Sequence, residues 1–377
     1  MLMDIQERLS VIKGCRDCPM CRQIDRMSEF TGRESNTPRG RAMTLWGIEK
    51  KLLAWEDEGV SDIMYTALLD GLAQEWCDGN YPNDELINDS RRSLVEKGLA
   101  PAVVKSIASS LKKYRNPFFM KEAGVNALVD EAGGRVAGEP ELVIFFGSTV
   151  RVKRQAAALS FIRILRKLKI SFEVLDAEPD SGFLSYQLGD FETAENQAKR
   201  VVTLLNGCKA KKLVSLSASA YRMFKTRYKQ FGAALPEDLA VQHVTEFISD
   251  LLESGRLTVN KKISKKITYH DPASLGRFTF VHKAPRDLLD AITAPDHFVE
   301  MEWNRARANS AGETGGLSFT YPEIARYVAR LRVEEALATG AEILACSDGL
   351  CEGMLELVSE RPEIEIKSLI ELVEAVL

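Results

Sequence analysis

The chain has 377 residues, of which 45% are hydrophobic and 28% charged, enough for two or three globular domains. Its net charge of −4 gives no general attraction to nucleic acid or to an anionic membrane, so we expect no nucleic-acid partner. The longest apolar run, residues 142–146, is far below the roughly 20 residues that span a bilayer, and the N-terminus lacks a signal-peptide pattern. We therefore expect a cytoplasmic protein that reaches a membrane only through a partner.

Residues 1–125 are predicted to be helical. Apolar residues recur at helical spacing in four segments, at residues 41–58, 61–76, 84–98 and 101–114. Pro101 stands at a predicted helix start, where the missing N–H of proline costs nothing. Several glycines then interrupt the pattern, and residues 126–140 are predicted to be a linker.

From residue 141 onward, short apolar strands alternate with amphipathic helices. Strands are predicted at 141–147, 170–176 and 211–217, with helices at 152–169 and 191–207. The alternation then repeats, with strands predicted at 267–271, 297–303 and 341–347 and helices at 284–292 and 321–340. The similar length and order of the two parts favour duplicated parallel βαβ domains, at residues 141–258 and 259–377.

Three cysteines, Cys15, Cys18 and Cys21, follow one another at intervals of three residues. A two-cluster ferredoxin carries two copies of C-x2-C-x2-C-x3-C-P, and the fourth cysteine of each copy binds the other cluster. In the first copy Asp25 stands at the fourth position, whereas a second copy ending at Cys77 keeps its fourth cysteine. The first three positions of that second copy hold Ala67, Asp70 and Ala73.

The lost cysteines and the retained cysteines therefore belong to different clusters. The ligands of one cluster are all replaced, and those of the other are all present: Cys15, Cys18, Cys21 and Cys77. We predict that these four cysteines hold one [4Fe–4S] cluster. Zinc remains the alternative metal, although zinc sites usually take their cysteines as two separated pairs. Asp78 follows Cys77, where the ferredoxin motif has proline.

Motifs along the whole chain support a family resemblance. They are "TPRGR" at 37–41, "NPF" at 116–118, "YHDP-x-x-LGR" at 269–277, "APRDLLDAI" at 284–292 and "VEMEWN" at 299–304. With them, the chain resembles the heterodisulfide reductase subunits that carry paired cysteine-rich CCG domains, which are related to the iron–sulfur subunit of glycolate oxidase. The resemblance implies an α+β multidomain fold: a helical ferredoxin-like domain followed by two tandem Rossmann-like α/β CCG-type domains.

In that family the cysteines of the two repeats bind non-cubane iron–sulfur clusters at which disulfide chemistry takes place. In this chain the first repeat has other residues at all five positions: Ser148, Asp180, Ser181, Ser217 and Ala220. The second repeat has Ala273, Ser310, Ala311 and Gly349, and keeps only Cys346. One cysteine in ten positions cannot hold a multi-iron cluster, because thiolates supply the bonds. We therefore expect the disulfide-reducing clusters to be missing.

Three functions follow as hypotheses. The first is a non-catalytic electron-transfer subunit of a larger oxidoreductase, with a flavoprotein or iron–sulfur subunit as its partner. The second is a scaffold or assembly subunit whose metal site is purely structural. The third is the binding of a small polar ligand in the emptied pocket, which we expect to be lined by Asp180, Ser217, His270 and Glu313.

The remaining thiols, Cys208, Cys346 and Cys351, are interpreted as incidental, since no histidine lies near them in the sequence. His270 is interpreted as a structural hydrogen-bonding residue.

Overall fold

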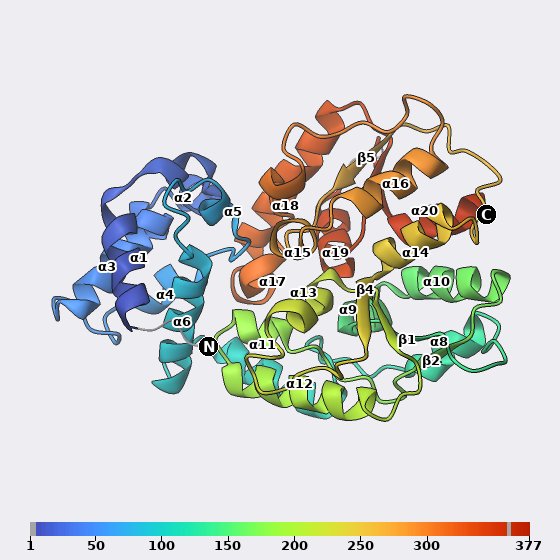
Figure 1. Ribbon diagram of the computed structural model, residues 1–377. Helices are drawn as coiled ribbons and strands as arrows, with labels where there is room; N and C mark the ends of the chain where they lie inside the picture. The colour runs from blue at the N-terminus through green and yellow to red at the C-terminus, as the bar shows by residue number, and fades with distance from the viewer. Residues whose placement is uncertain (1–4, 360–362) are drawn as a thin grey trace.

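The computed structural model describes residues 5–359 and 363–377 (Figure 1). The chain begins with a series of short helices, of which the first six form the group drawn in blue and cyan in Figure 1, whereas the eighth lies apart from them, beside the first sheet. These are α1 (Ile5–Asp17), α2 (Arg26–Thr31), α3 (Pro38–Glu49), α4 (Val60–Tyr65), α5 (Leu72–Glu75), α6 (Asn83–Glu96), α7 (Ala102–Tyr114) and α8 (Val125–Glu131). Two 3-10 turns, η1 (Met20–Ile24) and η2 (Glu34–Asn36), lie among them.

The prediction of one continuous helix at residues 61–76 is wrong. It is split into α4 and α5, because Leu69 and Gly71 take positive φ angles of 54° and 77° between them. Helices α6 and α7 lie where the sequence predicts helices. The predicted linker, 126–140, includes most of α8, and Leu128 and Val129 are buried in the core of the following sheet.

The first sheet has four parallel strands in the order β2-β1-β3-β4. Its strands are β1 (Leu142–Phe145), β2 (Phe172–Val174), β3 (Lys212–Ser215) and β4 (Ala240–His243). The helices that accompany it are α9 (Ser148–Lys153), α10 (Gln155–Lys167), α11 (Phe183–Gln187), α12 (Phe191–Leu205), α13 (Ala218–Thr226) and α14 (Val244–Glu253).

The second sheet has three parallel strands in the order β5-β6-β7: β5 (Ile267–His270), β6 (Ile343–Cys346) and β7 (Glu365–Ser368). Its helices are α15 (Gly276–Thr279), α16 (Lys283–Ile292), α17 (Leu317–Thr320), α18 (Pro322–Ala338), α19 (Gly349–Val358) and α20 (Leu369–Val376), with turns η3 (Arg305–Arg307) and η4 (Thr314–Gly316). The strand predicted at 297–303 is wrong, since this segment makes only one isolated bridge to β5, between Phe298 and Ile267.

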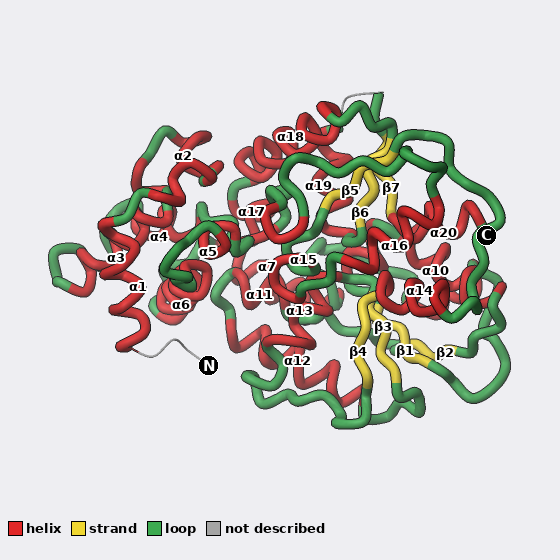
Figure 2. The backbone as a smooth tube through the Cα atoms, turned by 45° about the horizontal axis from the view of Figure 1, so that its top comes forward, coloured by secondary structure: helices red, strands yellow, loops and turns green. Residues whose placement is uncertain are grey.

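The two sheets share one hydrophobic layer. Helices α10 and α14 of the first sheet pack against α20 and α16 of the second, between the sheets (Figures 1 and 2). Phe161 and Phe247 meet edge to face there, 6.0 Å between ring centroids, within a core that includes Leu289 and Val373. The fold is therefore α/β with two parallel sheets joined through a common helical core. Within the described residues, no helix has both the length and the apolar character needed to cross a bilayer.

Arg91 connects the helical region to both sheets. Its fully buried guanidinium donates to the carbonyls of Met64 and Ala67 in the helical region, at 3.0 and 2.8 Å. It also donates to the carbonyls of Gln187 at 2.8 Å and Gly315 at 2.7 Å, which belong to the first and second α/β parts. These four hydrogen bonds fix the position of the helical region on the α/β body.

Candidate functional site

The four predicted ligands come from two segments of the helical region. Cys15 lies in the last turn of α1, Cys18 just after it, Cys21 in η1, and Cys77 two residues after α5. Cys15 is 6% exposed, Cys21 and Cys77 are partly buried, and Cys18 is exposed. The set therefore runs from the core of the helical region to its surface.

Neighbouring cysteines affect the pKa values of the Cys15 and Cys21 thiols. Burial, together with smaller contributions from Cys77 and Cys18, raises the pKa of Cys15 to about 11. Burial raises the pKa of Cys21 to about 12, with additional contributions from Asp25, Cys15 and Cys77. Such mutual effects require short distances, so the fold brings the two cysteine segments together.

Tyr81 holds these two segments side by side. Its ring packs directly on Gly14, next to Cys15, and on Gly79, two residues after Cys77. A Cβ on either glycine would collide with the ring in its present position, so a larger residue there would displace Tyr81. Asn83 adds a side-chain hydrogen bond to the thiol of Cys15.

The donor chemistry of the four cysteines suits both candidate metal centres. A zinc ion accepts four cysteine sulfurs, and a [4Fe–4S] cluster is likewise held by four cysteine thiolates. The residues present therefore fit an all-sulfur metal centre.

The four replaced positions that would have held the second cluster, one from the first copy and three from the second, also lie together. Asp25, Ala67, Asp70 and Ala73 line one cavity of about 60 Å³, next to Cys21. Asp25 caps α2 by accepting from the backbone N–H of Met27 at 2.7 Å, and it pairs with buried Arg41 at 3.5 Å. Asp70 accepts from the N–H of Leu72, at the start of α5, at 3.0 Å. Asp25 thus serves as a helix cap and Asp70 as the acceptor of a local turn, at positions where the ferredoxin motif has ligands.

Four of the five replaced positions of the first α/β repeat line a second cavity, of about 30 Å³: Ser148, Asp180, Ser181 and Ser217. Ser148 donates a hydrogen bond to the carboxyl group of Asp180, and burial raises the pKa of that group. Ala220 does not line the cavity but donates its N–H to Ser217 Oγ at 3.2 Å. Glu313, from the second repeat, lines the same cavity.

The replaced positions of the second repeat are more dispersed. Ala311 and Cys346 lie in an apolar core, whereas Ser310 lines the cavity beside Asp25. Ala273 is buried, and Gly349 begins α19. The pocket predicted from sequence is therefore only partly assembled, because Asp180, Ser217 and Glu313 line one cavity and His270 does not.

A buried group that the sequence interpretation missed lies next to this cavity. The ligating atoms of His270, Glu313 and Cys351 all lie within 4.8 Å of one another. His270 ends β5 and Cys351 lies in the first turn of α19, so the group forms at the carboxyl ends of β5 and β6. The three residues are far apart in the chain. The sequence placed His270 and Glu313 in one predicted pocket, but interpreted Cys351 as an incidental thiol.

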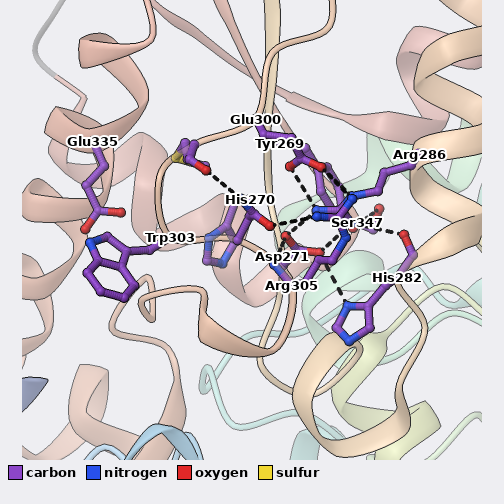
Figure 3. A network of polar contacts seen from close by, with 12 residues as sticks. Tyr269, His270, Asp271, His282, Arg286, Glu300, Trp303, Arg305, Glu335 and Ser347 are labelled. Carbon is purple, nitrogen blue, oxygen red and sulfur yellow. Dashed lines mark hydrogen bonds and ion pairs between the residues drawn. The ribbon is translucent and has the colours of Figure 1, made fainter. Parts of the chain in front are cut away.

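A charged network holds the loop that follows β5 (Figure 3). Arg286 donates to both oxygens of Asp271, at 2.9 and 2.8 Å, and the N–H of Arg305 donates to the same carboxylate at 2.8 Å. Burial opposes ionisation of Asp271, but the hydrogen bonds from Arg286 hold its pKa well below its usual range. The network fixes the backbone next to His270.

The chain is similar in sequence to subunits of iron–sulfur oxidoreductases. No protein-family model matches the chain. A dihydromethanophenazine:CoB–CoM heterodisulfide reductase subunit of Methanosarcina acetivorans is 30% identical over 329 residues, 84% of this chain and 79% of that protein. A Bacillus subtilis protein named "Probable iron-sulfur-binding oxidoreductase FadF" is 27% identical over 285 residues, 72% of this chain and 40% of that protein.

A solved structure supports the fold alone. The crystal structure of a hypothetical protein from Helicobacter pylori aligns with a TM-score of 0.61 over 98% of this chain and 76% of that chain, at 11% identity. This likeness extends to nearly the whole chain and carries no functional information.

Proposed function

The chain belongs to the heterodisulfide reductase family that includes the Methanosarcina protein, and from this premise we propose that it is an electron-transfer subunit with one [4Fe–4S] cluster. The cluster would be held by Cys15, Cys18, Cys21 and Cys77, in a ferredoxin-like domain formed by residues 1–125. Two degenerate CCG-like domains, at 141–258 and 259–377, would form the body of the subunit.

The observation that carries the proposal is one complete cysteine set beside ligand sets that are replaced. The packing of the Tyr81 ring on Gly14 and Gly79, which places the two cysteine segments next to each other, supports a metal centre at that set. Serine, alanine, aspartate or glycine stands at every other position except that of Cys346, and these residues provide no thiolates. We therefore propose that the subunit relays electrons and does not reduce a disulfide itself.

The exposure of the cysteine segment indicates where a redox partner would approach. Cys18 is exposed, and Met20, between the second and third cysteines, is 61% exposed. A bound [4Fe–4S] cluster supplies one-electron transfer. The chain provides burial at Cys15 on one side and an open surface at Cys18 on the other, so electrons would be exchanged with a flavoprotein or iron–sulfur subunit at that surface.

The test is a spectroscopic redox titration of the anaerobically purified full chain. We expect a broad visible absorbance that bleaches on reduction and returns on oxidation. Cys18→Ser should lose at least about three quarters of it, and Cys208→Ser, a change at a distant thiol, should keep it. If the cluster absorbance is present but the cluster cannot be reduced within a physiological range of potential, the scaffold function is favoured. The absence of cluster absorbance would refute the proposal.

A further inference from the structure

We propose that the cavity between α7 and α12 binds a phosphate monoester whose organic part carries hydroxyl groups, such as a sugar phosphate. The cavity has a volume of about 340 Å³ and lies where the helical region meets the first α/β part. Small-molecule sites have volumes of roughly 300–1,000 Å³ and often lie where two parts of a fold meet. None of the four predicted cluster ligands lines this cavity, so the proposal does not depend on the iron–sulfur cluster.

The walls of the cavity are polar, and none of the residues that line it is acidic. Its polar residues are Ser109 and Lys112 from α7 and Thr193, Asn196, Gln197 and Arg200 from α12. The four residues of α12 follow the spacing i, i+3, i+4 and i+7, which places them on one face of the helix. The cavity is therefore formed by one face of α12 and the adjacent end of α7.

Two cations line the cavity without an ion-pair partner. Among the described residues, neither Lys112 nor Arg200 forms an ion pair, whereas the basic residues next to them in the chain are engaged elsewhere. Lys113 lies over a tyrosine ring, 4.9 Å from its centroid, and Lys199 pairs with Glu195 at 2.5 Å. The cavity thus has two uncompensated positive charges, which favour an anionic ligand.

The acidic residues of α12 belong to a different cavity. Glu192 and Glu195 line a separate space of about 580 Å³, on another face of the helix. The arginines of that larger cavity are paired, as Arg92 is with Glu96 at 2.7 Å. Helix α12 thus presents carboxylates to one cavity and Arg200 to the other, so the positive charge beside Arg200 is not cancelled within the site.

The donors of the cavity suit a phosphate group. A guanidinium presents a planar fork of N–H groups that matches two phosphate oxygens, and an ammonium group adds a compact charge. The hydroxyl groups of Ser109 and Thr193 and the amide of Asn196 are further donors on the same walls. A phosphate monoester carries a charge of about −1.5 to −2 at pH 7, which the two cations offset.

Gln197 indicates that the ligand also carries a hydrogen-bond donor. This residue is 4% exposed, and its buried Oε1 atom has no hydrogen-bond partner among the described residues. A buried acceptor without a partner costs free energy, which a hydroxyl group of the ligand would recover. The cavity is also larger than a phosphate group, so the hydroxylated part of an ester has room beside Gln197.

The test is isothermal titration calorimetry of the full chain with glucose 6-phosphate, inorganic phosphate and glucose as probes. We expect one site for glucose 6-phosphate, with an affinity at least about fivefold higher than that for phosphate. Lys112→Gln and Arg200→Gln should each weaken its binding at least about tenfold. The matched controls, Lys113→Gln and Lys199→Gln, remove neighbouring charges and should weaken it less than about twofold at physiological salt.

A variant at Gln197 separates the contact with the hydroxyl group from the contact with the phosphate. Gln197→Leu should weaken the binding of glucose 6-phosphate at least about threefold and leave that of inorganic phosphate unchanged. Lys112 and Arg200 are exposed, so their variants test the site even if Gln197→Leu fails to fold. No binding of glucose 6-phosphate at millimolar concentration, equal weakening by the control variants, or equal affinity for inorganic phosphate would overturn the inference.

Discussion

The helical region and the α/β body differ in how they accommodate replaced ligand positions. In the helical region, Asp25 caps a helix and pairs with Arg41 at 3.5 Å, and Asp70 lies 4.0 Å from Arg277. In the α/β body, among the residues that the structure describes, Asp180 and Glu313 are buried without an ion-pair partner. Loss of a ligand set has thus produced compensated charge in one region and uncompensated charge in the other.

This difference indicates what each region can still bind. A replaced ligand position whose carboxylate already has a cationic partner, such as Asp25, has little need of a metal ion. A cavity with buried and unpaired carboxyl groups has an electrostatic reason to bind one or to stay protonated. Four predictions test the comparison, from the largest effect to the smallest.

The largest effect is expected where the two regions are joined. Arg91→Met removes all four hydrogen bonds between the guanidinium and buried carbonyls, and should destabilise the chain by about 5 kcal/mol. Guanidinium denaturation followed by circular dichroism measures this change. Arg92→Met, at the more exposed neighbour, is the matched control. If Arg91→Met lowers the free energy of unfolding by less than about 1 kcal/mol, the contact between the regions does not depend on Arg91.

The second prediction concerns the compensated charge. Arg41→Gln leaves Asp25 buried without its cation, and should lower the free energy of unfolding by about 4 kcal/mol. The double variant Asp25→Asn/Arg41→Gln should recover about half of that loss, because asparagine also caps helices. Equal stability of the single and double variants in urea denaturation would contradict the ion pair.

The third prediction is a pH dependence. Burial raises the pKa of Asp84 from 3.8 to about 7, and Asp70 adds to the shift. The folded state therefore binds this proton more tightly than the unfolded state, so its stabilising effect is complete below pH of about 4 and is lost as the pH rises through about 7. Asp84→Asn should flatten the dependence by about 3 kcal/mol between these values, as measured by denaturation at each pH. An identical slope in the wild-type chain and the variant would refute it.

The smallest expected effect is a difference in stability between one aspartate-to-asparagine variant in each region. Asp180→Asn removes a buried carboxyl group without an ion-pair partner, so metal-free protein at pH 8 should be unchanged or more stable by about 1 kcal/mol. Asp25→Asn, in contrast, leaves Arg41 without its anion and should destabilise. Thermal denaturation of both variants gives the comparison, and destabilisation by Asp180→Asn as large as by Asp25→Asn would remove the distinction.

The sequence predicted features that depend on local pattern. The apolar runs of β1, β3 and β6 predict buried strands, and the cysteine spacing leads to residues that the fold brings together. Strands β4 and β7 lack such runs, because each has exposed or partly buried positions at a sheet edge. The role of Arg91 and the meeting of His270, Glu313 and Cys351 depend on contacts between distant segments, which no local pattern encodes.

The most direct measurement of the central claim is iron content combined with low-temperature EPR of the anaerobically purified, dithionite-reduced full chain. About four irons per chain and one S = 1/2 signal, both lost in Cys77→Ser, is the predicted result. Zinc at the four cysteines without iron, or no metal there at all, would contradict the account and leave this protein without a carrier for electrons.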